Sequence, residues 1–146
     1  MPPLTVSEKQ EVLYRKALHG VLFQKEIFDK TPPLQSVDLT TKTALLFNGP
    51  GYSPGMLALA HHGILFLDEI GFYSKSLLVA LRGFLEEKKV VCTKQKKSTE
   101  FKTECMVVAA FNPCLCGTDK KRCICTQGQK QAYYRRIGSP FFDRFD

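Results

Sequence analysis

The sequence has no apolar run near the roughly 18 to 20 residues that a membrane-spanning helix needs, and its N-terminus has no signal-peptide pattern. These absences argue against an integral membrane protein and against export, so we expect a cytoplasmic location. A disulfide framework is also unexpected, because the six cysteines come without an export signal. At 146 residues the chain has the size of one domain with a single core.

Long tracts of like charge are absent too, since no run of consecutive cations or anions exceeds three residues. The charge is nevertheless unevenly placed. Residues 1–87 carry 8 Lys and Arg against 9 Asp and Glu, whereas residues 88–146 carry 13 against 5, so the net charge of +7 lies in the second part. Such a basic field favours nucleic acid or another polyanion, and an ordinary solvated basic face is the alternative.

The first part of the chain predicts one helix followed by irregular structure. Residues 5–22 indicate a helix, because apolar side chains recur at helical spacing and Thr5 with Glu8 forms a capping-box pattern. Residues 28–63 are rich in Pro, Gly, Ser and Thr, which predicts a loop or irregular hairpin rather than regular structure. An irregular segment of this length usually serves a function or an interface.

The remainder predicts an α/β layer architecture with a parallel sheet. Residues 64–67 form a short apolar run that indicates a buried parallel strand. Ser74 can cap a helix with one apolar stripe, and residues 90–103 alternate about a polar turn as a two-stranded hairpin. Residues 105–111 indicate a second buried strand.

Side chains suited to nucleotide chemistry follow the two predicted parallel strands. Asp68 and Glu69 come after residues 64–67, and Asn112 closes residues 105–111. Open parallel sheets bind ligands beyond the carboxyl ends of their strands, where these side chains could converge. An apolar strand ending in Asp-Glu is the Walker B arrangement, in which Asp holds nucleotide-bound Mg²⁺ and Glu orients or deprotonates the attacking water. A strand that simply meets solvent is the alternative.

Asn112 fits a residue that holds the attacking water or senses the γ-phosphate. The alternative is a turn, because Asn followed by Pro is a common turn opener.

Four of the six cysteines fall in one short loop, residues 113–126. They are spaced as C-x-C, six residues, C-x-C: Cys114, Cys116, Cys123 and Cys125. Four thiolates in one tight loop match a tetrahedral structural zinc site. Reduced buried thiols and redox-active thiols are the alternatives, because the usual zinc knuckle is C-x-x-C. Cys92 and Cys105 lie in apolar strand contexts and are expected in the core. His61 and His62 are expected to pack or support the strand rather than bind a metal.

Five stretches, in this order and at these spacings, resemble the magnesium-chelatase-like AAA+ ATPases, in particular the ComM/YifB branch associated with competence and DNA processing. They are LALAHHGILFLDEI, LRGFLEE, VVAAFNPCLCG, RCICT and RRIGSPFFDRFD. The resemblance covers residues 1–146 and is strongest after Leu57. It implies a partial AAA+ core of the P-loop NTPase type, with an insert in the second helix at residues 40–56 and the hairpin at 90–103 preceding sensor 1.

The resemblance also implies roles for single residues. Asp68 and Glu69 would be the Walker B pair, Asn112 would be sensor 1, and Arg144 is similar to the arginine finger that completes a neighbouring subunit's site. ATP and Mg²⁺ would be the cofactors, and the full-length protein would form a homo-oligomeric ring, expected to be a hexamer. The alternative for Arg144 is local pairing with Asp143 or Asp146.

The sequence departs from the family in its phosphate-binding part. None of the ten glycines is followed by Lys, so the Gly-Lys-Ser/Thr loop that holds the β- and γ-phosphates is missing. The chain reads as beginning just past that loop and ending at the finger, without the family's helical lid. We therefore expect this chain alone to bind ATP weakly and to hydrolyse it poorly.

Three functions remain as hypotheses. The first is a fragment or degenerate copy of a ring-forming ATPase that couples ATP hydrolysis to DNA processing, with hairpin residues Lys94, Lys96 and Lys97 on DNA phosphates. The second is the ATPase motor of magnesium chelatase, although the four cysteines favour the ComM/YifB branch. The third is a non-catalytic, zinc-stabilised nucleic-acid-binding module descended from such an ATPase, which the missing Gly-Lys loop would favour.

Overall fold

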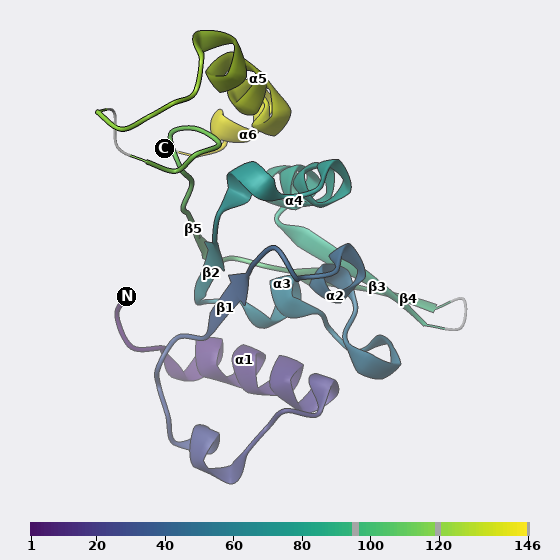
Figure 1. Cartoon of the computed structure of the whole chain (residues 1–146). Helices are drawn as coiled ribbons and strands as arrows, with labels where there is room; N and C mark the ends of the chain where they lie inside the picture. Colours follow the sequence, from purple (N-terminus) through teal and green to yellow (C-terminus); the bar gives the residue numbers. More distant parts are fainter. Residues whose placement is uncertain (95–96, 119–120, 146) are drawn as a thin grey trace.

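The computed structural model describes residues 1–94, 97–118 and 121–145, and it has a mixed α/β architecture (Figure 1). Three parallel strands form the sheet in the order β1-β2-β5; they are β1 Leu34–Val37, β2 Ile64–Leu67 and β5 Met106–Ala109. Val37 pairs with Leu67 and Leu67 pairs with Ala109, so the three strands end level. The predicted α/β fold with a parallel sheet is confirmed.

Helices pack on one face of this sheet and lie beyond its two ends (Figure 1). Within the described residues, none is long and apolar enough to cross a membrane. The α-helices are α1 Val6–His19, α2 Thr43–Phe47, α3 Met56–Leu59, α4 Lys75–Glu87, α5 Gln127–Ile137 and α6 Ser139–Phe142. The 3-10 helices are η1 Gln24–Ile27, η2 Pro50–Tyr52 and η3 Ile70–Phe72.

Capping residues set the ends of the longer helices. The Glu8 carboxylate accepts the Thr5 N–H at 2.8 Å while the Thr5 hydroxyl accepts the Glu8 N–H, so α1 begins where the capping box predicts. It ends three residues earlier than expected, because Gly20 takes a left-handed conformation (φ 82°) that caps the helix. The Ser74 hydroxyl accepts the Leu77 N–H at 3.2 Å and starts α4 as predicted.

The expectation of irregular structure over residues 28–63 is wrong in part, because this range contains β1, α2, η2 and α3. These elements are too short for a periodic pattern to show. Val37 is the one fully buried side chain of β1, and Leu46 and Leu57 anchor α2 and α3 in the core at 0% exposure. Burial against the rest of the molecule, rather than local propensity, therefore makes these elements.

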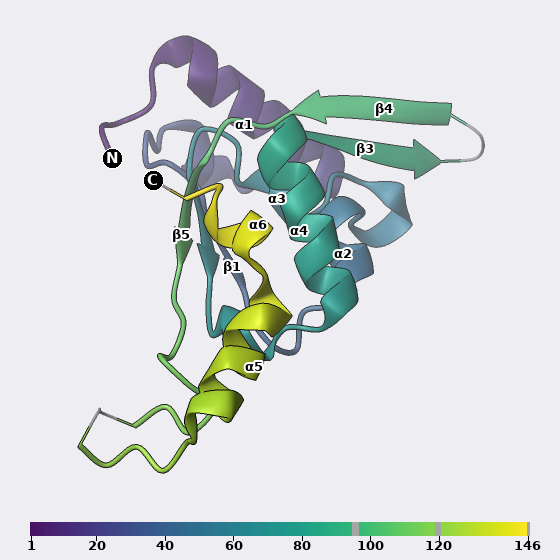
Figure 2. The same ribbon diagram turned by 90° about the horizontal axis from the view of Figure 1, so that it is seen from above.

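One face of the sheet packs on the core, and the other is partly open. Val37, Leu65 and Leu67 belong to the buried cluster, beside α4 (Figure 2). On the opposite face, Met106 and Val108 of β5 are 53% and 41% exposed. The prediction of a buried strand over residues 105–111 is therefore wrong for this face, and the strand itself is shorter, at Met106–Ala109.

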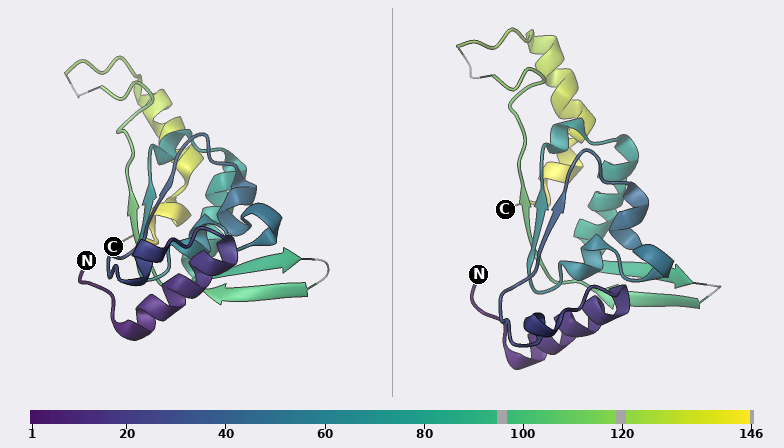
Figure 3. Two further views of the ribbon diagram at one scale, coloured as in Figure 1. Left: turned by 90° about the horizontal axis from the view of Figure 1, so that it is seen from below. Right: turned by 60° about the horizontal axis from the view of Figure 1, so that its bottom comes forward.

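Strands β3 Lys89–Lys94 and β4 Lys97–Lys102 form an antiparallel hairpin where the alternation predicts one. It projects away from the sheet, and its base is held in the core by Val90 and Phe101 (Figure 3). Figure 3 also shows α1 next to the amino ends of the parallel strands. Helix α5 lies beyond the carboxyl ends of these strands. The amino end of the sheet is therefore next to α1, and its carboxyl end faces α5.

Candidate functional site

Asp68 and Glu69 lie directly beyond β2, at the carboxyl edge of the sheet, and both are exposed. The backbone fixes their position from both sides. Asp68 N–H donates to the Val37 carbonyl at 2.9 Å, and Ile70 N–H donates to the Ala110 carbonyl at 3.1 Å. The acidic pair is thus held between hydrogen bonds to both neighbouring strands.

Glu69 has a left-handed backbone, with φ 51° and ψ 44°. For a residue with a Cβ atom this conformation costs about 1–2 kcal/mol. The hydrogen bond of Ile70 and its burial at 1% exposure hold the chain in this turn. Backbone strain at an exposed acidic residue, enforced by a buried neighbour, is typical of functional sites.

Asn112 lies beyond β5, the strand next to β2, and it is half-buried. Because the strands end level, Asn112 belongs to the same edge as Asp68 and Glu69. Gly117 packs behind it, since a Cβ at Gly117 would lie 3.4 Å from Asn112 Nδ2. The three residues that the sequence suggested for nucleotide chemistry therefore follow the carboxyl ends of two adjacent parallel strands.

Sequence reasoning missed a third carboxylate at this edge, Asp38, which follows β1 in register with Asp68. Its Oδ1 accepts hydrogen bonds from the Thr40 hydroxyl at 2.7 Å, the Thr40 N–H at 2.9 Å and the Thr41 hydroxyl at 3.0 Å. These bonds lower the pKa of Asp38, and the bond from the Thr40 hydroxyl lowers it most. Asp38 is therefore already engaged in its own turn. Its only sequence signal was its place after a strand of four residues.

Tyr73 lies beneath the edge and is fully buried, with its hydroxyl donating to the Val37 carbonyl at 2.6 Å. Burial raises the pKa of this phenol, and the negative charges of Asp68 and Asp38 raise it further. A neutral phenol thus supports the end of β1 next to the carboxylates.

Arg144 lies elsewhere, after α6. Its guanidinium donates a hydrogen bond to the Glu86 carboxylate in the last turn of α4. Asp146, one of the two local partners considered for it, lies outside the described residues. Glu86 is near the C-terminal end of α4, whereas Asp68 comes shortly before its N-terminal end. At 1.5 Å per residue, Lys75 at the start of the helix and Glu86 are separated by about 16 Å along the helix axis. Within one chain, the structure does not bring Arg144 to the acidic edge.

The sulfur atoms of Cys114, Cys116, Cys123 and Cys125 all lie within 4.8 Å of one another. Three of the separations are 3.3 Å (Cys114 to Cys116), 3.5 Å (Cys114 to Cys123) and 3.7 Å (Cys116 to Cys123). A tetrahedral zinc ion with Zn–S bonds of about 2.3 Å needs sulfurs about 3.8 Å apart. The four thiols therefore fit a zinc ion with small adjustments.

Hydrogen bonds within the cysteine loop shift the pKa values of two thiols in opposite directions. A hydrogen bond with the Thr118 hydroxyl is the main cause that lowers the pKa of Cys116 to about 5, and hydrogen bonding to Cys116 raises that of Cys114 to about 12. Lys130 of α5 lies beside Cys123, and this interaction raises the pKa of the ammonium. Sequence reasoning missed Lys130, which belongs to the helix after the loop.

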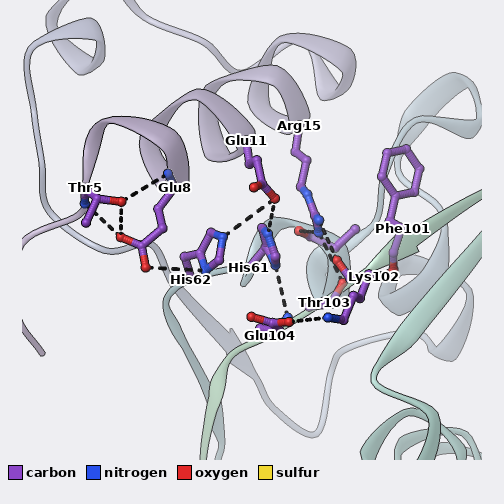
Figure 4. Close-up of polar contacts among 11 residues, drawn as sticks. Thr5, Glu8, Glu11, Arg15, His61, His62, Phe101, Lys102, Thr103 and Glu104 are labelled. Atoms are coloured by element: carbon purple, nitrogen blue, oxygen red, sulfur yellow. Dashed lines mark hydrogen bonds and ion pairs between the residues drawn. The ribbon is translucent and has the colours of Figure 1, made fainter.

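A second group of potential metal ligands, Glu11, His61 and His62, lies at the amino ends of the strands (Figure 4). His61 is 3% exposed, and its Nδ1 accepts the Glu104 N–H at 3.0 Å. The proton of the neutral ring is therefore on Nε2, which donates to Glu11 Oε2 at 2.8 Å. With both ring nitrogens used, His61 has no lone pair for a metal, and the packing role predicted for it fits this geometry.

Arg15 completes this network from α1 (Figure 4). Arg15 is 6% exposed. Its guanidinium donates to the carbonyls of Ala58 at 3.0 Å and Lys102 at 2.5 Å, and to the Thr103 hydroxyl at 3.2 Å. The carbon at its centre lies 5.6 Å from the Phe101 ring centroid. Arg15 thus fastens α1 to the base of the hairpin.

The hairpin lysines are only partly described. Lys94 ends β3 and Lys97 begins β4, so both flank the tip. Lys96 lies outside the described residues.

Comparison with known families identifies the whole chain. The family described as "Magnesium chelatase, subunit ChlI" matches residues 1–146. The chain belongs to this family. Family membership and the ComM/YifB relatives described next confirm the resemblance seen in the sequence motifs.

Curated relatives place the chain more closely within the family. It is 32% identical over its full length to an uncharacterized protein of Mycobacterium tuberculosis and 29% identical over its full length to the YifB protein of Salmonella typhimurium. Over 70% of its length it is 35% identical to the competence protein ComM of Haemophilus influenzae. The chain spans 30%, 29% and 20% of these proteins, respectively.

Proposed function

We propose that the chain is the hydrolytic part of a ring-forming ATPase that couples ATP hydrolysis to DNA processing, with ATP and Mg²⁺ as cofactors. The observation that carries the proposal is the position of Asp68, Glu69 and Asn112 after two adjacent strands of the parallel sheet. Membership of the magnesium chelatase family supports an ATPase, and the relative named as a competence protein supports DNA as its substrate.

In this proposal Asp68, Glu69 and Asn112 have different roles in hydrolysis. Asp68 holds Mg²⁺, for which exposed carboxylate oxygens are suitable ligands, and Glu69 orients or deprotonates the attacking water. Asn112 donates a hydrogen bond from its amide to that water or to the γ-phosphate. The backbone bonds of Asp68 and Ile70 fix these groups before nucleotide arrives, so little reorganisation is needed.

Arg144 acts on the site of a neighbouring subunit. Its distance from the acidic edge of its own chain, along most of α4, supports action in trans. A guanidinium presents several donors to the charge that develops on the γ-phosphate. Hydrolysis would then depend on assembly, with Glu86 holding Arg144 when no neighbour is present.

The four cysteines hold a structural zinc ion in the loop between β5 and α5. Cys114 comes two residues after Asn112, and Cys125 comes two residues before α5. The ion would therefore fix the position of Asn112 relative to α5. Helix α5 is followed along the chain by α6 and Arg144.

The hairpin would bind DNA through Lys94, Lys96 and Lys97 at its tip. The two strands that lead to the tip project away from the sheet (Figure 1), which supports a contact with a partner. Replacing one lysine that binds a phosphate of single-stranded DNA should reduce the slope of log affinity against log salt by about 0.7.

The proposal is tested by ATP hydrolysis at millimolar ATP and Mg²⁺, which offsets the weak affinity expected without a Gly-Lys loop. Glu69→Gln should lower the rate by at least about 10²-fold, the usual contribution of a positioned base. The matched control is Glu87→Gln, an exposed residue at the end of α4, which should leave the rate unchanged.

The rate per chain should also rise with protein concentration, because Arg144 comes from a neighbour. A rate that is the same in Glu69→Gln and Glu87→Gln would refute the hydrolytic role of the acidic edge. The zinc-stabilised, non-catalytic module would then be the better account of the chain.

A further inference from the structure

A cavity of about 190 Å³ lies between α4 and the C-terminal end of α5, away from the cysteine loop and the hairpin. Four cationic side chains line it: Lys75, Arg82, Arg135 and Arg136. Its floor includes Leu78 and Ile137, which are 5% exposed each. No Asp or Glu is among the described residues that line it.

Among the described residues, no carboxylate forms an ion pair with the cations of this cavity. In the described ranges, no ion pair involves Lys75, Arg82 or Arg135. Glu86 lies one turn from Arg82 on α4, but its carboxylate is paired with Arg144. Cations gathered over an apolar floor repel one another with little compensation, so an anion entering the cavity would gain from all of them.

Arg136 is held in place before any ligand binds. Its Nη2 donates to the carbonyls of Phe72 at 3.2 Å and Tyr73 at 3.0 Å. These acceptors are neutral, so they orient the guanidinium and leave its charge uncompensated. A pre-oriented guanidinium loses less side-chain entropy on binding than one that is mobile.

We propose that this cavity is a phosphate-binding site that takes the phosphate groups of nucleic acid or nucleotide. Arginine is suited to this ligand, because its planar donors match two oxygens of one phosphate at once. The volume admits one phosphate group with part of its attached ester, whereas larger acidic surfaces would contact only the rim. The exposed cations allow a chain of phosphodiesters to continue past the opening.

The site is separate from the features that carry the proposed function. Its residues come from α4, the end of α5, Gly138 and α6. The acidic edge follows β2 and β5, and the proposed DNA-contacting lysines belong to the hairpin. Nucleic-acid affinity that depends on this cavity would therefore stand even if the acidic edge were inactive.

The test uses the double variant Arg82→Gln with Arg135→Gln, and a control that removes the same charge elsewhere, Lys25→Gln with Lys30→Gln. Both control lysines are exposed and lie in η1 and the loop after it. Thermal unfolding followed by circular dichroism verifies that both variants fold. Binding is measured by fluorescence anisotropy of a labelled single-stranded oligothymidine over a series of salt concentrations, and by calorimetry with MgATP.

We expect the cavity variant to bind the oligonucleotide at least tenfold more weakly at low salt. Its salt slope should fall by about 1.4, as two phosphate contacts on a single strand imply, while the control keeps both values. A selective loss of MgATP binding with unchanged oligonucleotide binding would identify the phosphate source as a nucleotide. Equal affinities of the cavity variant and the control for both probes would overturn the proposal.

Discussion

The Arg144 guanidinium is paired with the Glu86 carboxylate at the end of α4 farther from Asp68. The two side chains are 31% and 44% exposed, so water screens the pair on one side. A surface pair of this kind contributes about 0–1 kcal/mol. The interaction therefore positions Arg144 without contributing much to the stability of the fold.

We predict that Glu86→Gln and Arg144→Gln each change the free energy of unfolding by less than about 1 kcal/mol. Urea denaturation of the two variants and the unmutated chain measures this. Losses of several kcal/mol would mean that Arg144 is a structural residue, and its assignment as the candidate finger would fail.

Gly71 of η3 lies against Tyr133 of α5 so closely that a Cβ at position 71 would overlap the tyrosine hydroxyl. Tyr133 is 2% exposed and cannot move aside without undocking α5. Gly71→Ala should therefore lower the free energy of unfolding by about 1–3 kcal/mol, the usual cost of overpacking. Urea denaturation followed by circular dichroism gives the value.

Gly83 is the matched control for this change. It lies inside α4, and a Cβ there would meet nothing within 4 Å. Gly83→Ala should be neutral or stabilising by up to about 1 kcal/mol, since alanine favours helix. Equal effects of the two substitutions would contradict the close approach of η3 to α5.

The cysteine geometry predicts that the purified chain carries one zinc ion. Cys114→Ser and Cys125→Ser should each abolish it, and a chelator should lower the melting temperature of the unmutated chain. Cys105→Ala is the control, because Cys105 lies apart from the quartet and should leave the zinc content unchanged. Elemental analysis that finds no zinc in the unmutated chain would end the metal hypothesis.

The His61 network predicts loss of stability in acid. Burial lowers the pKa of His61 below its ordinary value of 6.5, so the unfolded chain takes up a proton at a higher pH than the folded chain. Stability is then fully present above about pH 6.5 and falls as the pH drops below that value. Protonation also removes the Nδ1 lone pair that accepts the Glu104 N–H.

Melting temperatures between pH 7 and pH 5 measure this effect. They should fall in the unmutated chain and vary less with pH in His61→Gln, which has no imidazole at this position. Glu11, whose pKa the His61 hydrogen bond lowers, continues the loss at still lower pH in the unmutated chain. The same pH dependence in both proteins would show that His61 does not control it.

The elements that the sequence predicted share strong local signals. Residues 64–67 are continuously apolar, α4 has a serine cap and a full apolar stripe, and the hairpin alternates on both sides of its turn. β1, α2 and α3 lack such signals, because each has only four or five residues and depends on the burial of side chains such as Leu46. Their existence follows from tertiary packing, which a local pattern does not record.

Some residues of the candidate sites could be predicted from the sequence, and others could not. The placement of Asp68, Glu69 and Asn112 was predictable, because these residues follow strands whose relation is that of neighbours in a parallel sheet. The pairing of Arg144 with Glu86 joins residues far apart in the sequence, and so does the cavity between Arg82 and Arg135. Those relationships arise only when α4, α5 and α6 pack together, so the sequence alone did not indicate them.

The most direct test of the central claim, that Asp68 and Glu69 form the metal and water half of a nucleotide site, is nuclear magnetic resonance with Mn²⁺ and ATP. Paramagnetic Mn²⁺ in place of Mg²⁺ should broaden the backbone amide signals of Asp68, Glu69 and Asn112 first. Asp68→Asn should abolish this pattern, whereas Asp29→Asn should keep it. Broadening centred on other residues, or unchanged in Asp68→Asn, would contradict the claim.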